Sequence, residues 1–77
     1  MISVDILSPS KSTHLDVDCI FFPGVLGEFE VLRNHAPIIS ILEEGRIRWR
    51  TGGKEDSIEV KGGVVMVRHN IIKICLD

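Results

Sequence analysis

Hydrophobic and polar residues alternate along most of this chain, and the alternation predicts β-strands. In residues 46–50 (RIRWR), Ile47 and Trp49 fall on one face, and the arginines fall on the other. Residues 2–7 and 57–61 repeat the pattern, with isoleucine and valine on one face and mainly polar side chains on the other. Strict alternation of this kind is typical of half-buried strands in an antiparallel sheet.

Other segments predict strands from less regular patterns. Around the first cysteine, the alternation places Val17, Cys19 and Phe21 on the buried face. Residues 64–68 and 71–76 are more continuously apolar, which indicates central strands of a sheet.

Turn-forming residues divide the chain about every ten residues, a spacing typical of sandwiches and barrels. Gly52, Gly53 and Asn70 can supply the positive φ that tight hairpin turns require. The β-branched isoleucines within 38–41 favour a strand where a helical turn might compete. We therefore predict one all-β domain over residues 1–77, an antiparallel β-sandwich of two facing sheets rather than a closed barrel.

The composition is typical of a small folded domain, and the net charge limits the kinds of partner that it is expected to bind. The chain has 77 residues, of which 44% are hydrophobic and 26% charged, so disorder is not expected. Its net charge of −2 argues against a nucleic-acid backbone as the main partner. No apolar run approaches the ~18 residues that a membrane-spanning helix needs.

The two cysteines, Cys19 and Cys75, are far apart and form no C-x-x-C motif. The N-terminus lacks the basic region and apolar run of a secretory signal. These features predict a reducing, cytoplasmic setting in which both thiols are free and buried as small hydrophobes. A disulfide between them is the alternative.

Catalytic and metal-binding motifs are weak. His14, His35 and His69 are too widely spaced for a familiar zinc pattern, and no serine lies in a nucleophile elbow. Residues 51–54 (TGGK) lack the spacing of a phosphate-binding loop and predict a hairpin turn instead. No catalytic residue, cofactor or metal is therefore expected.

Three arginines on one strand face leave a second function open. Arg46, Arg48 and Arg50 could bind single-stranded nucleic acid, as in oligonucleotide-binding barrels. Such platforms normally place exposed aromatic rings beside the charge, whereas this chain has no tyrosine and Trp49 faces the other way. A solvated face or an acidic protein partner is favoured, with a nucleic-acid-binding β-barrel as the alternative.

Three segments in order carry a family resemblance. Residues 23–32 (PGVLGEFEVL), residues 35–50 (HAPIISILEEGRIRWR) and residues 52–77 resemble the N-terminal β-sandwich domain of the epsilon subunit of F-type ATP synthases. The resemblance covers nearly the whole chain. It implies a non-catalytic subunit of the central rotor stalk, which binds the gamma subunit and rests on the membrane c-ring.

The same resemblance implies where such a chain acts. It would couple proton translocation to ATP synthesis as a peripheral part of the complex. It would lie at the cytoplasmic face of the bacterial plasma membrane, with no segment inserted into the bilayer. The family's longer members continue into a helical hairpin that carries ATP sensing and inhibition of hydrolysis, and these properties are not carried over to a chain that stops at Asp77. Met1 favours a natural N-terminus.

The resemblance also implies two interfaces. Glu28 matches the acid of the family's Gly-Glu-Phe motif, which faces the c-ring, and the apolar Val25 and Leu26 beside it suggest a buried contact there. The gamma-facing segment is then His35, Ala36 and Pro37.

The chain departs from the family pattern at two places near these interfaces. Glu30 stands where the family usually has glycine, so the local backbone or the ring contact is expected to differ. Arg33 and Asn34 replace a Pro-Gly pair, and because asparagine tolerates the left-handed conformation, the turn is expected to survive.

Overall fold

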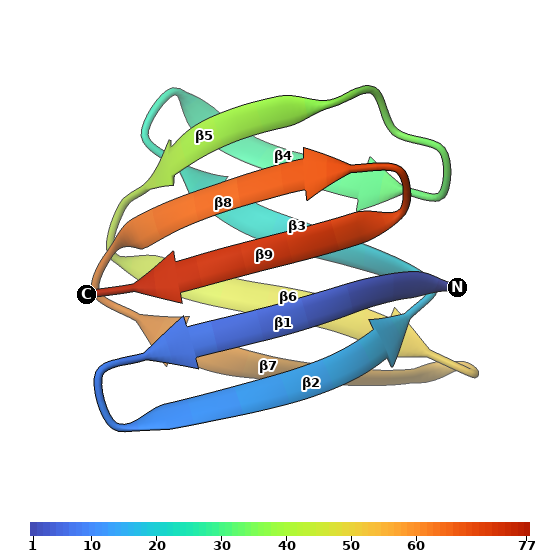
Figure 1. The fold of residues 1–77 in the computed structure, drawn as a ribbon, viewed down its shortest axis with the longest axis horizontal. Helices are drawn as coiled ribbons and strands as arrows, with labels where there is room; N and C mark the ends of the chain where they lie inside the picture. Colours follow the sequence, from blue (N-terminus) through green and yellow to red (C-terminus); the bar gives the residue numbers. More distant parts are fainter.

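The computed structural model describes all 77 residues and contains nine β-strands and no helix (Figure 1). The strands are β1 (Ile2–Ser8), β2 (Lys11–Val17), β3 (Cys19–Gly24), β4 (Gly27–Leu32), β5 (Ile38–Leu42), β6 (Gly45–Thr51), β7 (Lys54–Val60), β8 (Gly63–Arg68) and β9 (Ile71–Leu76). The all-β prediction is confirmed. The chain accordingly offers no candidate for a membrane-spanning helix.

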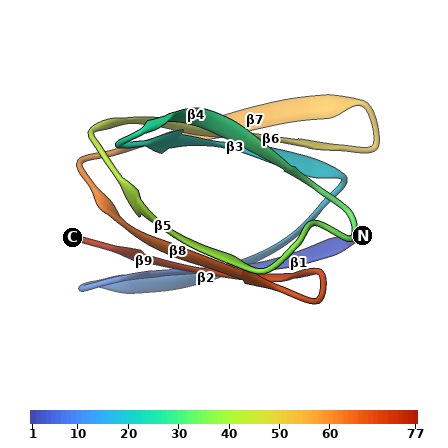
Figure 2. The same ribbon diagram turned by 90° about the horizontal axis from the view of Figure 1, so that it is seen from above.

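The strands form one hydrogen-bonded sheet that folds over into two layers (Figure 2). The order is β2-β1-β9-β8-β5-β3-β6-β7, and β4 pairs with β3 outside this path. The sheet passes from one layer to the other between β5 and β3, which share only the pair Gly24 and Leu42. On the opposite side, β2 and β7 are the free edges. The predicted sandwich is thus open on one side and joined on the other.

One strand pair departs from the antiparallel prediction. β1 and β9 run parallel, while every other pair is antiparallel. Alternation of side chains reports which face a residue occupies, and it carries no information on the direction of the neighbouring strand.

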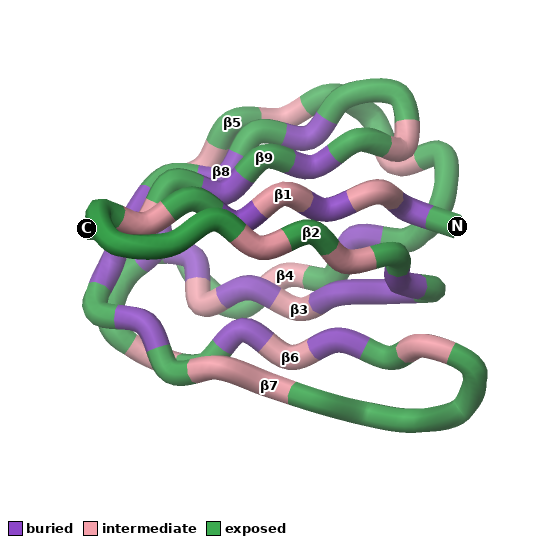
Figure 3. The backbone as a smooth tube through the Cα atoms, turned by 60° about the horizontal axis from the view of Figure 1, so that its bottom comes forward, coloured by how far each residue is buried: buried purple, intermediate pink, exposed green.

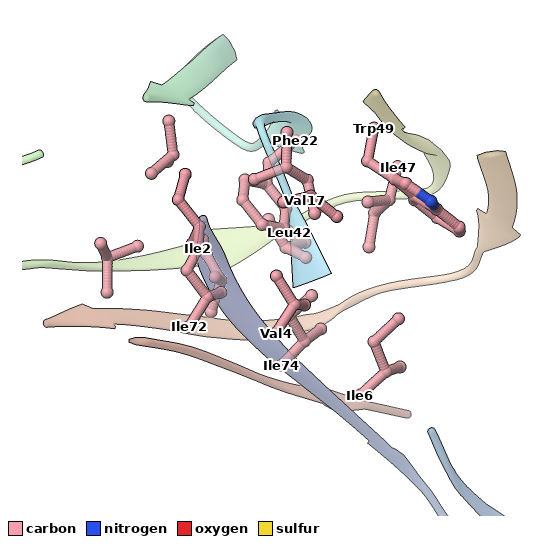
Figure 4. Packing of buried hydrophobic residues seen from close by; sticks show 14 of the residues in the cluster. Ile2, Val4, Ile6, Val17, Phe22, Leu42, Ile47, Trp49, Ile72 and Ile74 are labelled. Carbon is pink, nitrogen blue, oxygen red and sulfur yellow. The ribbon is translucent and has the colours of Figure 1, made fainter. Parts of the chain in front are cut away.

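Apolar side chains from both layers fill the space between them (Figure 4). Figure 3 shows buried residues alternating with intermediate ones along β1, and along β8 buried residues alternate with exposed ones, as a strand with one core face requires. The predicted inward positions of Ile47 and Trp49 are confirmed, at 0% and 9% exposure. No polar or charged residue is buried.

The chain crosses between layers at Asp18, where the predicted continuous strand is broken. β2 ends at Val17 and β3 begins at Cys19 in the other layer, so only Asp18 separates the two strands. The Asp18 backbone N–H donates to the Arg50 carbonyl at 2.8 Å, and its carboxylate accepts from the Gly52 N–H at 2.9 Å. These bonds fix the crossover against the β6–β7 turn.

The crossover restarts the alternation, so the predicted core position of Phe21 is wrong. Ile20 and Phe22 are fully buried, whereas Phe21 points outward and is half-buried. Phe22 packs instead against Phe29, with ring centroids 5.4 Å apart. Cys19 is buried as predicted, although it lies outside the main core cluster.

Both cysteines are free, so the disulfide alternative is not formed. Cys75 is exposed, and the prediction that it is buried is wrong. It alternates with the core residues Ile72 and Ile74 along β9 and therefore points outward.

The turn predictions are confirmed. Gly52 and Gly53 have φ values of 57° and 80°, and Asn70 has 62°. Asn34 also adopts a left-handed φ of 65°, so the turn survives without the family's glycine. Glu30 lies in the regular part of β4 opposite Phe21, with its side chain exposed, so the backbone there is undisturbed.

Candidate interaction surfaces

Much of the outer side of the layer that contains β5, β8 and β9 is apolar and uncovered, and the charged Lys73 lies beside Met66 on the same side. We call the apolar part the outward apolar face. It consists of Leu7, Ile39, Ile41, Val64, Met66 and Cys75. Strand register aligns four of these side chains in one row across four strands, since Leu7 pairs with Cys75, Cys75 with Val64, and Val64 with Ile41.

The sequence of the central strands creates this face. β8 is apolar at every position from Val64 to Val67, so Val65 and Val67 enter the core and the residues that alternate with them face outward. The prediction that β8 and β9 are central is confirmed, but each is buried on one side only. Ile39 and Ile41 on β5 extend the surface and are 74% and 60% exposed. Contiguous exposed apolar surface of this kind marks a site of interaction.

The segment predicted to face gamma lies beside one end of the outward apolar face. It belongs to the loop between β4 and β5, where the His35 N–H donates to the Leu32 carbonyl at 3.2 Å. The His35 ring donates from Nδ1 to the Ala36 carbonyl at 2.7 Å. Pro37 lines a shallow depression together with Met66 of the apolar face.

The pair predicted to contact the ring lies at the other end of the sandwich. Val25 and Leu26 form the tip of the β3–β4 turn, and Leu26 is completely exposed. The Val25 N–H donates to the Ile41 carbonyl at 3.0 Å, which holds the turn against the end of β5. Figure 1 shows this turn and the β4–β5 loop at opposite ends of β4.

Glu28, the predicted ring-facing acid, already has a partner within the chain. It lies on the outer side of β4, and its carboxylate accepts from Arg48 Nη2 at 3.5 Å. Both side chains remain partly exposed, so the pair is weak and open to exchange with another charge.

Each arginine of the stripe on β6 is matched by glutamate. Arg46 lies 2.7 Å from Glu59, and Arg50 lies 3.3 Å from Glu55, its register partner on β7. Arg48 lies between Glu28 and Glu55, at 3.5 and 4.0 Å. This neutralised face offers no cluster of free cations, so it gives the nucleic-acid alternative no support.

A charge cluster on the β1–β2 hairpin was not foreseen from the sequence. His14 Nδ1 donates to Asp5 at 2.7 Å, and Nε2 lies 3.4 Å from Asp16. The Asp5 hydrogen bond is the largest of the causes that raise the pKa of His14. The available signal was the hairpin register, which pairs Asp5 with His14. No group of His, Cys, Asp or Glu side chains in the structure is arranged to hold a metal ion.

Comparison with known proteins places the whole chain in one class. A family model described as the β-sandwich domain of the ATP synthase delta/epsilon chain matches residues 1–77. The chain is 36% identical over 77 residues to the ATP synthase epsilon chain of Leptospira borgpetersenii, with 99% of this chain and 61% of the relative covered. It is 35% identical over 74 residues to that of Rhodopseudomonas palustris, with 95% and 55% covered.

Two solved structures have the same fold. A chain in the Euglena gracilis mitochondrial ATP synthase structure that contains OSCP, F1 and the c-ring matches with a TM-score of 0.91 and 23% identity, covering 97% of this chain and 49% of that one. A chain in the central stalk and c-ring structure of Tetrahymena thermophila mitochondrial ATP synthase matches with a TM-score of 0.82 and 18% identity, covering 96% and 61%. The chain spans about three fifths of the length of the epsilon chains it matches.

Proposed function

Because the chain belongs to the β-sandwich domain family of ATP synthase delta and epsilon chains, we propose that it is a non-catalytic subunit of the central rotor stalk. It links the gamma subunit to the membrane c-ring and so couples proton translocation to ATP synthesis. Residues 1–77 act as one unit, which is a peripheral part of the complex at the cytoplasmic face of the bacterial plasma membrane.

The observation that carries this proposal is the outward apolar face. Five of its six side chains are among the large exposed hydrophobic residues of the chain, and the remaining one is the exposed Cys75. Exposing such a surface to water is unfavourable, whereas a complex in which a partner covers it is stabilised by the burial of apolar area. We assign this face to the gamma subunit, together with His35, Ala36 and Pro37 at its edge.

The c-ring contact belongs to the opposite end of the sandwich. The fully exposed Leu26 and its neighbour Val25 can pack against the ring, while Glu28 can pair with a basic side chain there. The exposed position of the β3–β4 turn and its anchorage on β5 support this assignment. A rim pair of this kind contributes about 1 kcal/mol or less and mainly fixes orientation.

The antiparallel ladders suit a connector that transmits torque. Forty of the 46 backbone hydrogen bonds lie within the strand ladders, and most strands pair on both sides. Shear between the two proposed contact sites would therefore act on many hydrogen bonds together. The chain needs no active site of its own for this function.

Association with the gamma subunit tests the proposal directly. The purified chain should co-elute with purified gamma subunit in size-exclusion chromatography. A correctly folded chain that never associates with gamma would end this proposal.

The orientation requires a second experiment. In a Cys75→Ser background, Glu28→Cys should crosslink to a cysteine in the polar loop of the c subunit. Lys54→Cys, at the opposite end of the sandwich, is the matched control and should not crosslink. Crosslinking from Lys54→Cys alone would reverse the proposed orientation.

A further inference from the structure

Two asparagines that are 36 residues apart in sequence bond to each other. The Asn34 backbone N–H donates to Asn70 Oδ1 at 2.6 Å, and Asn70 Nδ2 donates to Asn34 Oδ1 at 3.1 Å. Asn34 belongs to the β4–β5 loop, and Asn70 belongs to the β8–β9 turn. We call this pair the asparagine clasp.

Both residues of the clasp also shape the backbone. Asn34 and Asn70 have φ values of 65° and 62°, in the left-handed region that asparagine tolerates better than most residues. His69, beside Asn70, has a φ of 49°, so the β8–β9 turn places two successive residues in this region. Of these two turn residues, only Asn70 uses its side chain to reach a distant loop.

Asn70 joins three parts of the chain. Its carbonyl accepts from the Ser3 N–H at 2.9 Å, which fixes the turn to β1. Its side chain makes both bonds of the clasp and so fixes the start of the β4–β5 loop to the same point. The loop then continues through residues 35–37 to β5, whose first residue Ile38 pairs with Val67.

The clasp therefore acts on the edge of the outward apolar face. Pro37 and Met66 both line one shallow depression, Pro37 from the loop and Met66 from β8. The clasp bonds the β4–β5 loop, which carries Pro37, to the turn that follows β8, the strand of Met66. Without these bonds, the loop would be held by β4 and β5 at its ends and by the His35 hydrogen bonds within it.

We propose that Asn70 is a positioning residue for partner docking, which holds residues 35–37 in register with the outward apolar face before the partner arrives. This inference rests on the proposed assignment of both surfaces to the gamma subunit. Ordering a loop before binding improves affinity, because the entropy of fixing it is not lost on association. The side chain of Asn70 need not touch the partner to have this effect.

Amide hydrogen exchange of the isolated chain tests the positioning itself. Asn70→Gly keeps a residue that accepts positive φ but removes both bonds of the clasp, so the Asn34 amide should exchange about tenfold faster or more. Asn70→Asp keeps the acceptor for the Asn34 N–H and should retain most of the protection. His69→Gly is the matched control, because it makes the same backbone change one residue away and leaves the clasp intact.

The gamma subunit supplies the second readout. Titration with purified gamma should show affinity about tenfold weaker for Asn70→Gly, whereas Asn70→Asp should stay within about threefold of the wild type. Unchanged exchange at Asn34 in Asn70→Gly would overturn the inference. Faster exchange with unchanged affinity would overturn it too, while leaving the stalk proposal standing. A wild-type chain that does not bind gamma would overturn both.

Discussion

The guanidinium of Arg48 lies over the ring of Phe21, with its central carbon 4.4 Å from the ring centroid. The same guanidinium lies between Glu28 and Glu55, so the Phe21 ring packs against a charged cluster on the outer surface. A cation over an exposed ring contributes about 0.5–1 kcal/mol. Phe21 therefore belongs to the charged face, and its neighbour in sequence, Phe22, belongs to the core.

This division predicts very different effects for the two phenylalanines. Phe22→Ala should lower the free energy of unfolding by about 3–5 kcal/mol, because a fully buried ring is lost from between the layers. Phe21→Ala should cost only about 1 kcal/mol. A domain of this length has roughly 4–12 kcal/mol of stability in total, so Phe22→Ala should remove a large share of it. Urea denaturation measures both. Equal losses would contradict the assigned faces.

The strands with strict alternation could be predicted because one polar face leaves only one face for the core. Ile47 and Trp49 are the clearest example, since arginines flank each of them. Phe21 was misplaced because alternation holds only within one strand, and the crossover at Asp18 shifts it by one residue. No polar run announces that break, since a single residue separates the two strands.

The outward apolar face could not be recognised from pattern alone. The sequence of a continuously apolar strand such as β8 indicates that both faces are apolar. It does not indicate whether the second face is covered by the same chain or by a partner. The exposure of Cys75 has the same origin. The asparagine clasp depends on two turns that only the folded topology brings together, so neither asparagine signals it locally.

A charge on the outward apolar face should block association without unfolding the chain. Ile39→Lys introduces a cation at a position that is 74% exposed, so stability should change by about 0.5 kcal/mol or less. Affinity for the gamma subunit should fall by about a hundredfold, because the charge would have to be desolvated within the interface.

Leu32→Lys is the matched control for this test. Leu32 is also a large apolar residue, 54% exposed, but it lies on β4 in the other layer. Its substitution should leave gamma binding within about threefold of the wild type. If Leu32→Lys weakened binding as much as Ile39→Lys did, the interface would have to be moved to the other layer or extended to both.

Two glycines should respond differently to the addition of a methyl group. A Cβ at Gly63 would clash with the Cys75 carbonyl oxygen and lie 3.1 Å from the Leu76 Cα, and φ is 154°. Backbone atoms of a paired strand cannot easily move away, so Gly63→Ala should cost about 3 kcal/mol or more. At Gly52 the space is open and only the left-handed φ opposes a side chain, so Gly52→Ala should cost about 1 kcal/mol. Thermal denaturation of the two variants in parallel measures both losses of stability. A larger loss for Gly52→Ala than for Gly63→Ala would contradict this packing.

The Asp5–His14–Asp16 cluster makes one contribution to stability depend on pH. The hydrogen bond from His14 to Asp5 is the main cause that raises the pKa of His14 above 6.5, and the charge of Asp16 adds to it. Because the folded-state pKa exceeds the unfolded value, the folded chain binds the proton more tightly. This contribution is fully present below the unfolded pKa, and it is lost as pH rises through the folded pKa.

His14→Gln should abolish that dependence, because glutamine can fill the position on β2 but does not titrate. The difference in urea midpoint between the wild type and His14→Gln should be largest below pH 6.5 and should shrink at mildly alkaline pH. An NMR titration of the imidazole protons should independently show a midpoint above the ordinary histidine value. Asp5→Asn should move this midpoint back toward the ordinary value more than Asp16→Asn does, since the Asp5 contact is the shorter at 2.7 Å against 3.4 Å. A midpoint that is insensitive to Asp5→Asn would assign the shift to another cause and remove the hairpin from the pH dependence of stability.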